Sequence, residues 1–323
     1  MSNTSRIDPL IEASNLSFTY GERTGKRQVL TDIDLSVNAG EIFGLVGADG
    51  AGKTTLLHLM VGQLPQAGGE LSILGLAPTD PRLRQQIAYM PQGFGLYLDL
   101  SVQENLRFFA DLHGLTRSDA EARSRDLLQR TGLDGFEDRR AGQLSGGMMQ
   151  KLALACALMS RPKVMFLDEP TTGVDPVSRR AFWRLLDGVR SEGMAILYTT
   201  ANMDEAERCD RVGLLHDGRI ERQGPPAILA SANAILLGVE GPDARGHRQQ
   251  IRTLPGVSLV FPVGQQLKVW LAPGQTQAQF DADLSGVSSG LTTHVLAPTL
   301  NDVALRDLSS NKSVNARVAI AHE

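Results

Sequence analysis

The stretch GADGAGKT at residues 47–54 most constrains what this chain can fold into. It fits the pattern G-x-x-x-x-G-K-[ST], in which glycines let backbone N–H groups converge on phosphate oxygens. An apolar run, EIFGLVG (41–47), precedes it, and a pattern with helical periodicity (54–64) follows it. The stretch therefore predicts a turn between a buried strand and a helix whose positive end faces a bound phosphate.

The residues of this turn are the first candidates for a nucleotide site. Lys53 is expected to supply a positive charge between the β- and γ-phosphates. We expect the Thr54 hydroxyl to ligate Mg²⁺ and Thr55 to reach an α-phosphate oxygen. The alternative is a chance match in a glycine-rich chain, and the flanking strand and helix argue against it. The predicted nucleotide-binding residues are Gly47, Ala48, Asp49, Gly50, Ala51, Gly52, Lys53, Thr54 and Thr55.

A second apolar run ends in two carboxylates. VMFLDE (164–169) has the pattern of a buried strand that finishes at Asp168 and Glu169. We expect Asp168 to hold Mg²⁺, directly or through water, and Glu169 to orient and deprotonate an attacking water. A solvated acidic strand end is the alternative, and the phosphate loop upstream favours the metal and base roles.

Composition limits the partners and the compartment. The chain has 323 residues, a net charge of −4 and two cysteines, so it has room for two domains and carries no disulfide framework. The negative charge argues against nucleic-acid binding by a basic face. The polar N-terminus has no signal-peptide pattern, and no apolar run approaches the roughly 18 residues that span a bilayer. We expect a cytoplasmic protein that reaches a membrane only through another chain.

Strand and helix patterns alternate from residue 11 to about 225, which predicts a parallel sheet with helices packed on it. Half-buried strands are expected at 11–20 and 28–37, and a charged helix at 80–86. Two later helices are expected to begin with capping boxes, Ser101 with Glu104 and Ser118 with Glu121.

The character of the chain changes near residue 231. Four runs (AILLGVE, VSLVFPV, LKVWL and LTTHVLA) have strand patterns, and DARGHRQQIRTL and TQAQFDADL have helical ones. Their order, strand, helix, strand, strand, helix, strand, predicts a small ferredoxin-like α+β domain over 231–308. Residues 1–230 form the large domain, and 309–323 are expected to be a disordered tail.

Two further stretches complete a family pattern. LSGGM, which contains Ser145, Gly146 and Gly147, opens a helix, and YMPQ, which ends at Gln92, precedes it. Together with GADGAGKTT and LDEPTTGVDP, these stretches make residues 11 to about 230 resemble the nucleotide-binding subunit of ABC transporters. The resemblance implies an α/β fold: a P-loop NTPase ABC cassette with a mixed sheet and a helical subdomain at about 93–160.

The resemblance extends to a subgroup. GGM in place of GGQ after the serine, and the small C-terminal domain, resemble bacterial exporters of the drug- and antibiotic-efflux type. In LAPTLNDVALRDL, however, Asn301 and Ala304 replace the acid and the aromatic residue that the subgroup would have.

The resemblance also assigns roles to residues outside the phosphate loop. Tyr20 would stack on adenine, although a strand aromatic in the core is the alternative. Gln92 would contact Mg²⁺ and the attacking water, so it joins Lys53 and Glu169 as a catalytic residue. The loop after it, GFGLYLDL (93–100), would dock a membrane permease.

Other roles depend on a second cassette, because these proteins work as head-to-tail dimers. Ser145, Gly146 and Gly147 would bind the γ-phosphate held by the opposite protomer, and Asp175 would lie at the dimer interface. The resemblance therefore implies ATP and Mg²⁺ as cofactors. It implies a homodimer or a heterodimer with a second cassette as the working form.

A histidine is missing where the family has one. In the family, the apolar strand that follows LDEPTTGVDP by about one helix ends in Thr-His. In this chain Thr200 is followed by Ala201. That histidine would donate a hydrogen bond to the γ-phosphate, and alanine has no donor. Losing one transition-state donor costs roughly 10²–10³ in rate. We expect a site that holds ATP well and hydrolyses it slowly.

A second departure concerns Ala48 and Asp49, which replace proline and asparagine of the family pattern. An extra carboxylate near a triphosphate weakens binding unless it is paired. The effect is expected to be the smaller of the two departures, because the loop binds mostly through its backbone.

Three hypotheses follow from Ala201. The chain pairs with a different cassette that has its histidine, or it homodimerises and works slowly at both sites, or Glu169 alone suffices. We favour the first, because an asymmetric pair explains why LSGGM is intact although the histidine is absent at position 201. The predicted function is an ATPase subunit that powers export through a separate permease at the cytoplasmic face of the inner membrane. The alternative is a soluble ABC ATPase acting on ribosomes or another macromolecule.

Overall fold

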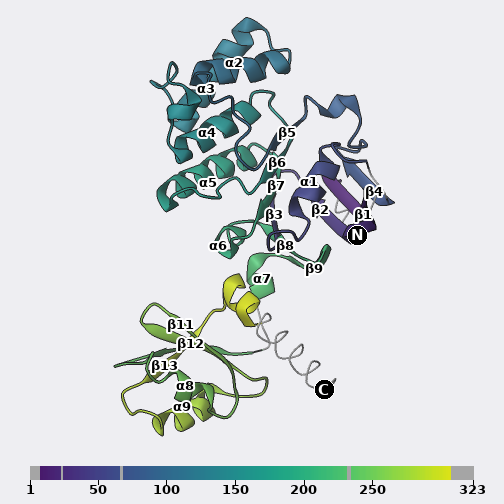
Figure 1. Ribbon diagram of the computed structural model, residues 1–323. Helices are drawn as coiled ribbons and strands as arrows, with labels where there is room; N and C mark the ends of the chain where they lie inside the picture. Colours follow the sequence, from purple (N-terminus) through teal and green to yellow (C-terminus); the bar gives the residue numbers. More distant parts are fainter. Residues whose placement is uncertain (1–7, 23–24, 66–67, 231–233, 307–323) are drawn as a thin grey trace, which may run out of the picture. The chain divides into compact units, whose positions relative to one another are not determined.

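The computed structural model describes residues 8–22, 25–65, 68–230 and 234–306. The chain divides into two compact units between Pro225 and Pro226 (Figure 1). The boundary predicted from the sequence, between 230 and 231, lies five residues further along. Within the described ranges, no helix is both long and apolar enough to cross a bilayer.

The first unit contains a three-stranded antiparallel sheet with the order β2-β1-β4. Its strands are β1 (Ile11–Glu22), β2 (Gly25–Val37) and β4 (Gly68–Ile73). Ile11, Ala13, Leu16 and Phe18 of β1 are buried in one apolar cluster, and a register shift between Ala13 and Leu16 changes which positions of the strand face it.

A six-stranded sheet forms the centre of the first unit, with the order β5-β6-β7-β3-β8-β9. Every neighbouring pair is parallel except β8 and β9. Strands β3, β6 and β7 are buried along their whole length. Strand β3 is apolar throughout, whereas β6 ends in Asp168 and β7 ends in two threonines. The strands are β3 (Ile42–Val46), β5 (Ile87–Met90), β6 (Val164–Asp168), β7 (Ala195–Thr200), β8 (Arg211–His216) and β9 (Arg219–Gly224).

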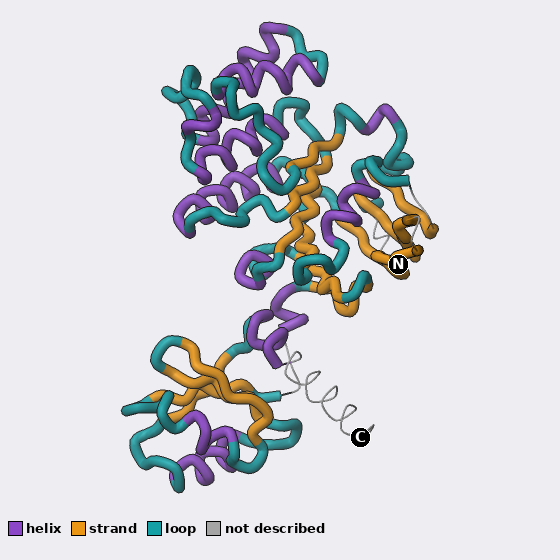
Figure 2. Tube along the Cα trace, in the orientation of Figure 1, coloured by secondary structure: helices purple, strands orange, loops and turns teal. Residues whose placement is uncertain are grey.

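The helices of the first unit take two positions. Helix α1 contacts β2, β4 and β6 and therefore lies between the two sheets. Helices α2, α3 and α4 pack against one another within the interval 93–160, and Figure 2 shows them gathered on one side of the six-stranded sheet. The helices are α1 (Lys53–Met60), η1 (Pro81–Leu83), α2 (Val102–Leu112), α3 (Arg117–Thr131), η2 (Ala141–Gln143), α4 (Gly146–Ala157), α5 (Pro176–Ser191) and α6 (Met203–Ala206).

One of the two predicted capping boxes is confirmed. Ser101 Oγ accepts the N–H of Glu104 at 3.1 Å, and Glu104 Oε2 accepts the N–H of Ser101 at 2.7 Å. The prediction for α3 is wrong. Thr116, not Ser118, caps this helix, and its Oγ1 accepts the N–H of Asp119 at 3.2 Å.

The prediction of a helix at 80–86 is also wrong, because the only helical element there is the 3₁₀ turn η1. Asp80 caps this turn by accepting the N–H of Arg82 at 2.9 Å. The carbonyl of Gln86 already accepts the N–H of Lys163 at 2.8 Å, at the start of the β5–β6 pairing. The N–H of Gln86 donates to the carbonyl of Leu83 at 2.8 Å, and β5 begins at the next residue, so the turn does not extend into a longer helix.

The second unit is an antiparallel sheet with helices. Its elements follow in the order strand, helix, strand, strand, helix, strand, after the short helix α7, and the sheet order is β11-β12-β10-β13. This is a split βαβ arrangement. The elements are α7 (Pro226–Ala230), β10 (Leu236–Glu240), α8 (Arg248–Arg252), β11 (Val257–Val263), β12 (Gln266–Leu271), α9 (Gln277–Ser285) and β13 (Thr292–Leu296).

Both faces of this second sheet carry apolar clusters. One cluster joins the strands to α8 and α9 through residues such as Ile251 and Phe280. The other contains Trp270 and Val303, and there Lys268 Nζ lies 2.8 Å from both carboxylate oxygens of Asp302. The predicted tail at 309–323 lies outside the described residues.

Candidate nucleotide-binding site

The phosphate loop joins the end of β3 to the start of α1. Gly52 precedes the helix with a φ of 112°, a left-handed conformation that a side chain would strain. No side chain caps α1, so its first N–H groups are available to an anion. The sequence prediction of a turn between strand and helix is therefore confirmed.

Lys53 is buried at the base of this loop. Its Nζ donates to the carbonyls of Gly47 at 2.7 Å and Ala48 at 3.0 Å, and it lies 2.9 Å from Glu169 Oε1. The side chain is only 4% exposed. An ammonium with these partners is already desolvated and oriented, so an incoming phosphate competes with Glu169 for it.

Asp49 stands apart from this buried group. Its carboxylate is 94% exposed and lies 3.9 Å from Lys53 Nζ. Water screens a charge that is this exposed. The extra acid of the loop is therefore expected to disturb nucleotide binding only weakly.

The two acids after β6 have different surroundings. Asp168 is 1% exposed; its Oδ1 accepts from Thr199 Oγ1 at 2.8 Å, and its Oδ2 is buried without a hydrogen-bond partner. Glu169 follows with a φ of 47°, and its N–H donates to Thr199 Oγ1 at 3.0 Å. The hydroxyl of Thr172 donates to Glu169 Oε2 at 3.2 Å. Thr199, a residue that sequence reasoning missed, thus contacts both acids.

Tyr89 is a further residue near Asp168 that was not predicted from the sequence as part of the site. Its hydroxyl lies 3.2 Å from His58 Nε2. Burial and the nearby Asp168 carboxylate raise the pKa of Tyr89 to about 12. The phenol therefore stays protonated at neutral pH.

A pocket of about 560 Å³ brings most of the predicted residues together. The Tyr20 hydroxyl lies 3.4 Å from Thr55 Oγ1 at its edge, and Gln92 lines it from the segment after β5. Arg27, Val29 and Thr172 also line it and were not predicted. Arg27 pairs with Tyr20 across β1 and β2, and only the strand register places it there. The lining residues are Tyr20, Arg27, Val29, Asp49, Gly50, Gly52, Lys53, Thr54, Thr55, Gln92, Glu169 and Thr172.

Ser145, Gly146 and Gly147 are not among the described residues that line this pocket. They form the start of α4, where Ser145 Oγ accepts the N–H of Met148 at 3.3 Å. A Cβ on Gly147 would lie 2.2 Å from Ser178 Oγ, so the close approach of α5 requires glycine. Hydrogen bonds from Ser178 lower the pKa of the neighbouring Asp175. This helix start is exposed at Ser145 and Gly146.

The segment after β7 carries no donor side chain toward the pocket. Ala201 is exposed, and Asn202 Oδ1 is used to cap α6 by accepting the N–H of Asp204 at 2.9 Å. None of the residues described as lining the pocket is a histidine.

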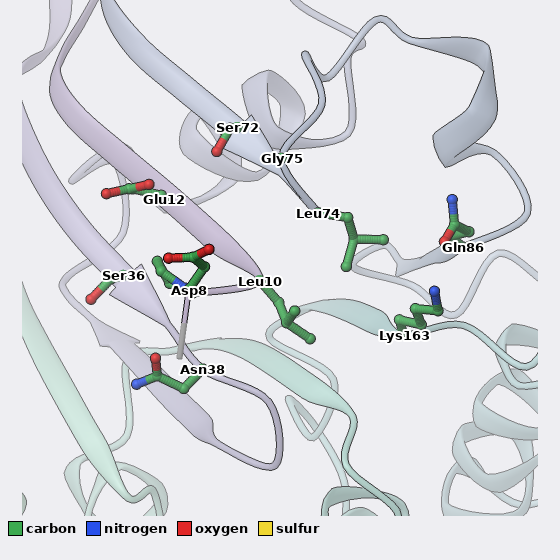
Figure 3. Close-up of a pocket in the computed structure, with 11 residues that line it drawn as sticks. Asp8, Leu10, Glu12, Ser36, Asn38, Ser72, Leu74, Gly75, Gln86 and Lys163 are labelled. Atoms are coloured by element: carbon green, nitrogen blue, oxygen red, sulfur yellow. The ribbon is translucent and has the colours of Figure 1, made fainter. Parts of the chain in front are cut away.

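A larger pocket of about 950 Å³ lies elsewhere in the first unit (Figure 3). Asp8 and Asn38 lie on one side of it, and Gln86 and Lys163 on the other. It contains no part of the phosphate loop. The nucleotide site is therefore identified by its chemistry and not by its size.

Comparisons with known proteins agree with this geometry. A sequence profile described as ABC transporter matches residues 30–172. The probable multidrug ABC transporter ATP-binding protein YbhF of Escherichia coli (strain K12) is 45% identical over 210 residues, which are 64% of this chain and 36% of that protein. The chain thus spans about a third of this relative's length.

Another relative aligns over nearly the whole chain. The Nod factor export ATP-binding protein I of Sinorhizobium fredii (strain NBRC 101917 / NGR234) is 34% identical over 311 residues, which are 94% of this chain and 87% of that protein. This alignment is longer than the first unit, which ends at Pro225, so it includes part of the second.

Two solved structures are similar in fold. The ATP-binding subunit of an ABC transporter matches with a TM-score of 0.61 and 32% identity, covering 68% of this chain and 91% of that one. The cbiO1 subunit from Clostridium perfringens, part of the ABC transporter complex cbiONQ, matches with a TM-score of 0.63 and 28% identity. It covers 69% of this chain and 90% of that one.

Proposed function

Because the chain belongs to the ABC transporter family of ATP-binding subunits, we propose that it binds and hydrolyses ATP to power export through a separate membrane permease. The observation that carries this proposal is the contact between Lys53 of the phosphate loop and Glu169, which directly follows the buried Asp168. Its own site hydrolyses ATP slowly, because the segment after β7 presents Ala201 where the family pattern has histidine.

Thr54, Gln92 and Asp168 hold Mg²⁺ in this proposal. The buried Asp168 Oδ2 has no hydrogen-bond partner, which is what a metal ligand or a metal-bound water needs. Among the described residues, no cluster of three His, Cys, Asp or Glu side chains exists. A hydroxyl, an amide, one carboxylate and the phosphates themselves therefore complete the site. Mg²⁺ bound there neutralises charge that develops on the phosphate oxygens.

The side chains of this chain divide the remaining work. Lys53 exchanges Glu169 for the β- and γ-phosphates, and this exchange frees the Glu169 carboxylate to accept a proton from water. Tyr20 stacks on the base, and the N–H groups at the start of α1 bind phosphate oxygens. Gln92 senses both the water and the permease, because it opens the loop at 93–100.

An apolar pocket of about 590 Å³ supports the permease contact. Phe94, Gly95 and Tyr97 of the 93–100 loop form part of its wall. Tyr97 is 48% exposed and Leu112 is 67% exposed, which is more apolar surface than a free loop needs. The wall is formed by His58, Gln63, Tyr89, Met90, Pro91, Phe94, Gly95, Tyr97, Phe108, Phe109, Leu112, Ala153, Cys156 and Ala157.

A second cassette completes the proposal. Ser145, Gly146 and Gly147 bind the γ-phosphate of that partner, since the N–H groups of a helix start suit an anion. We favour a partner that carries the histidine, so that LSGGM serves a fully active site while the site of this chain is mainly structural. The solved relative cbiO1 is part of a multi-subunit transporter complex, which supports assembly with other chains.

Purification from native membranes tests the proposal. A tagged chain is expected to bring down a permease and a second cassette with an intact histidine. Recovery of homodimers with a permease would favour the slow symmetric form. Fractionation with ribosomes and without a permease would overturn the export function in favour of the soluble alternative.

A further inference from the structure

A buried carboxylate lies behind the end of β7 and is used by none of the roles described so far. Glu205 of α6 is 4% exposed. It accepts hydrogen bonds from the hydroxyls of Thr171, Tyr198 and Thr200; the last two distances are 2.9 Å and 2.7 Å. Arg179 Nε lies 3.1 Å from its Oε1. We refer to these five residues as the Glu205 cluster.

The cluster fixes geometry more than it adds stability. A buried carboxylate is tolerated only when its oxygens are paired. Here three hydroxyls donate hydrogen bonds, and the Arg179 guanidinium supplies a nearby charge without a hydrogen bond from its Nε. A buried ion pair is often no more stabilising than apolar packing, because desolvation offsets the attraction. Three hydrogen bonds that converge on one buried carboxylate do, however, hold their donors in one arrangement.

The residues of the cluster come from four separate segments. Thr171 belongs to the turn after β6, and Arg179 belongs to α5. Tyr198 and Thr200 belong to β7, and Thr200 Oγ1 also accepts the N–H of Asn202 at 2.9 Å. The cluster therefore ties the turn that follows Glu169 to the segment that contains Ala201.

The turn from Glu169 to Thr172 needs such support. Glu169 has a φ of 47°, a left-handed conformation that is costly for a residue with a side chain. The N–H of Thr172 donates to the carbonyl of Glu169 at 3.2 Å, and its hydroxyl donates to Glu169 Oε2. The next residue back, Thr171, donates its hydroxyl to Glu205. Thr172 thus contacts the carboxylate of Glu169, and Thr171 connects the turn to Glu205.

We propose that Glu205 is a positioning residue for ATP hydrolysis. It holds the Glu169–Thr172 turn through Thr171, and so keeps Glu169 directed into the nucleotide pocket while contacting no part of the nucleotide itself. The inference rests on the proposed role of Glu169 as the base.

The Glu205→Gln variant tests this proposal with little change in volume. Single-turnover hydrolysis, with the chain in excess over ATP, is expected to slow by about tenfold to 100-fold, because small displacements of a reacting group have effects of this size. Affinity for a fluorescent ATP analogue is expected to stay unchanged, since the phosphate loop is untouched. Thr171→Val is expected to act in the same direction, and it leaves the carboxylate and its other partners in place.

Glu41→Gln is the matched control. Glu41 is also buried and paired with an arginine, since Arg211 Nη1 lies 3.0 Å from its Oε1. It stands before β3, at the end of the strand opposite the phosphate loop. This variant is expected to lower the melting temperature without slowing hydrolysis.

Two outcomes separate this inference from the proposed function. In a Glu169→Gln background, Glu205→Gln is expected to produce no further slowing, because the base that it positions is gone. Hydrogen exchange of residues 169–172 is expected to accelerate in Glu205→Gln whatever the hydrolysis rate. Unchanged exchange in this turn would overturn the inference, and so would unchanged hydrolysis in both Glu205→Gln and Thr171→Val. Absent ATP binding in the unmodified chain would instead contradict the proposed function.

Discussion

The ends of β6 and β7 are neighbours in one sheet, yet they contribute different numbers of polar side chains to the candidate nucleotide site. Asp168 pairs with Thr199 in the parallel register, so both ends reach the same edge of the sheet. Strand β6 ends in Asp168, whose Oδ2 is buried without a partner, and Glu169 follows it and contacts Lys53 of the phosphate loop. Strand β7 contributes the Thr199 hydroxyl and then ends at the methyl group of Ala201. In the proposed function, the β6 end supplies the base and the β7 end lacks a transition-state donor, while the phosphate loop binds the nucleotide independently of both.

The backbone on both sides of Ala201 is held by hydrogen bonds. Thr200 and Asn202, on either side of Ala201, both take part in hydrogen bonds within the chain. The backbone at position 201 is therefore fixed, and the departure is limited to one side chain. The comparison between the two strand ends yields four predictions.

Glu169→Gln is expected to have the largest effect. Removing the base on the β6 side should slow hydrolysis by about 10²–10⁴-fold, the usual contribution of general base catalysis. ATP affinity should be retained, because Lys53 keeps its contacts to the carbonyls of Gly47 and Ala48. Turnover and equilibrium binding measure the two effects. Glu104→Gln, in the cap of α2, is the control, and equal slowing in both variants would contradict the role of Glu169.

Ala201→His restores the donor on the β7 side. Turnover is expected to rise by roughly 10²–10³-fold, the contribution of one well-placed transition-state donor. Ala201 is exposed, so the larger side chain has room. Ala201→Phe adds a ring without a donor and is expected to give no increase. A similar increase in both variants would show that bulk and not hydrogen bonding matters.

Gly147→Ala tests the helix start that serves the partner cassette. Its new methyl group would lie 2.4 Å from Ser178 Cβ, so α4 must shift away from α5. Turnover that depends on dimerisation is expected to fall by about tenfold, while ATP binding to the isolated chain is unchanged. Gly188→Ala, within α5 and outside LSGGM, is the control, because only Arg130 Nη2, at 3.9 Å, lies within 4 Å of its added Cβ. Equal losses in both variants would contradict the packing argument.

Asp49→Asn is expected to have the smallest effect. Removing this exposed charge should tighten ATP binding by roughly twofold to fivefold at low salt, since exposed charge interactions are weak. The gain should vanish at high salt, because the Debye length falls to about 3 Å at 1 M. Titration of a fluorescent ATP analogue at two ionic strengths measures it. A gain that persists at high salt would point to a direct contact.

Local patterns predicted the parts of the site that lie close together along the chain. The phosphate loop needs glycines and a lysine at fixed spacing between a strand and a helix, so eight residues specify it. Asp168 and Glu169 follow from a buried strand that ends in acids. The strand patterns at 11–20 and 28–37 agree with β1 and β2, whose half-buried pairing imposes alternation.

Residues that depend on tertiary pairing were not predicted. Arg27 reaches the pocket because it is opposite Tyr20 in the β1–β2 register, and Thr199 reaches both acids because β7 lies beside β6. Tyr89 and the Glu205 cluster likewise join segments that are far apart in sequence. The cap of α3 was misplaced because Thr116 and Ser118 are both good caps, and only the fold selects between them.

One experiment tests the central claim most directly. ATP binding and single-turnover hydrolysis are both measured for the unmodified chain and for Ala201→His, with one preparation of each protein used for both measurements. The account predicts that both bind Mg²⁺ and ATP equally well, that the unmodified chain hydrolyses the bound ATP slowly, and that the histidine accelerates this step. Fast hydrolysis by the unmodified chain, left unchanged by the substitution, would contradict the account.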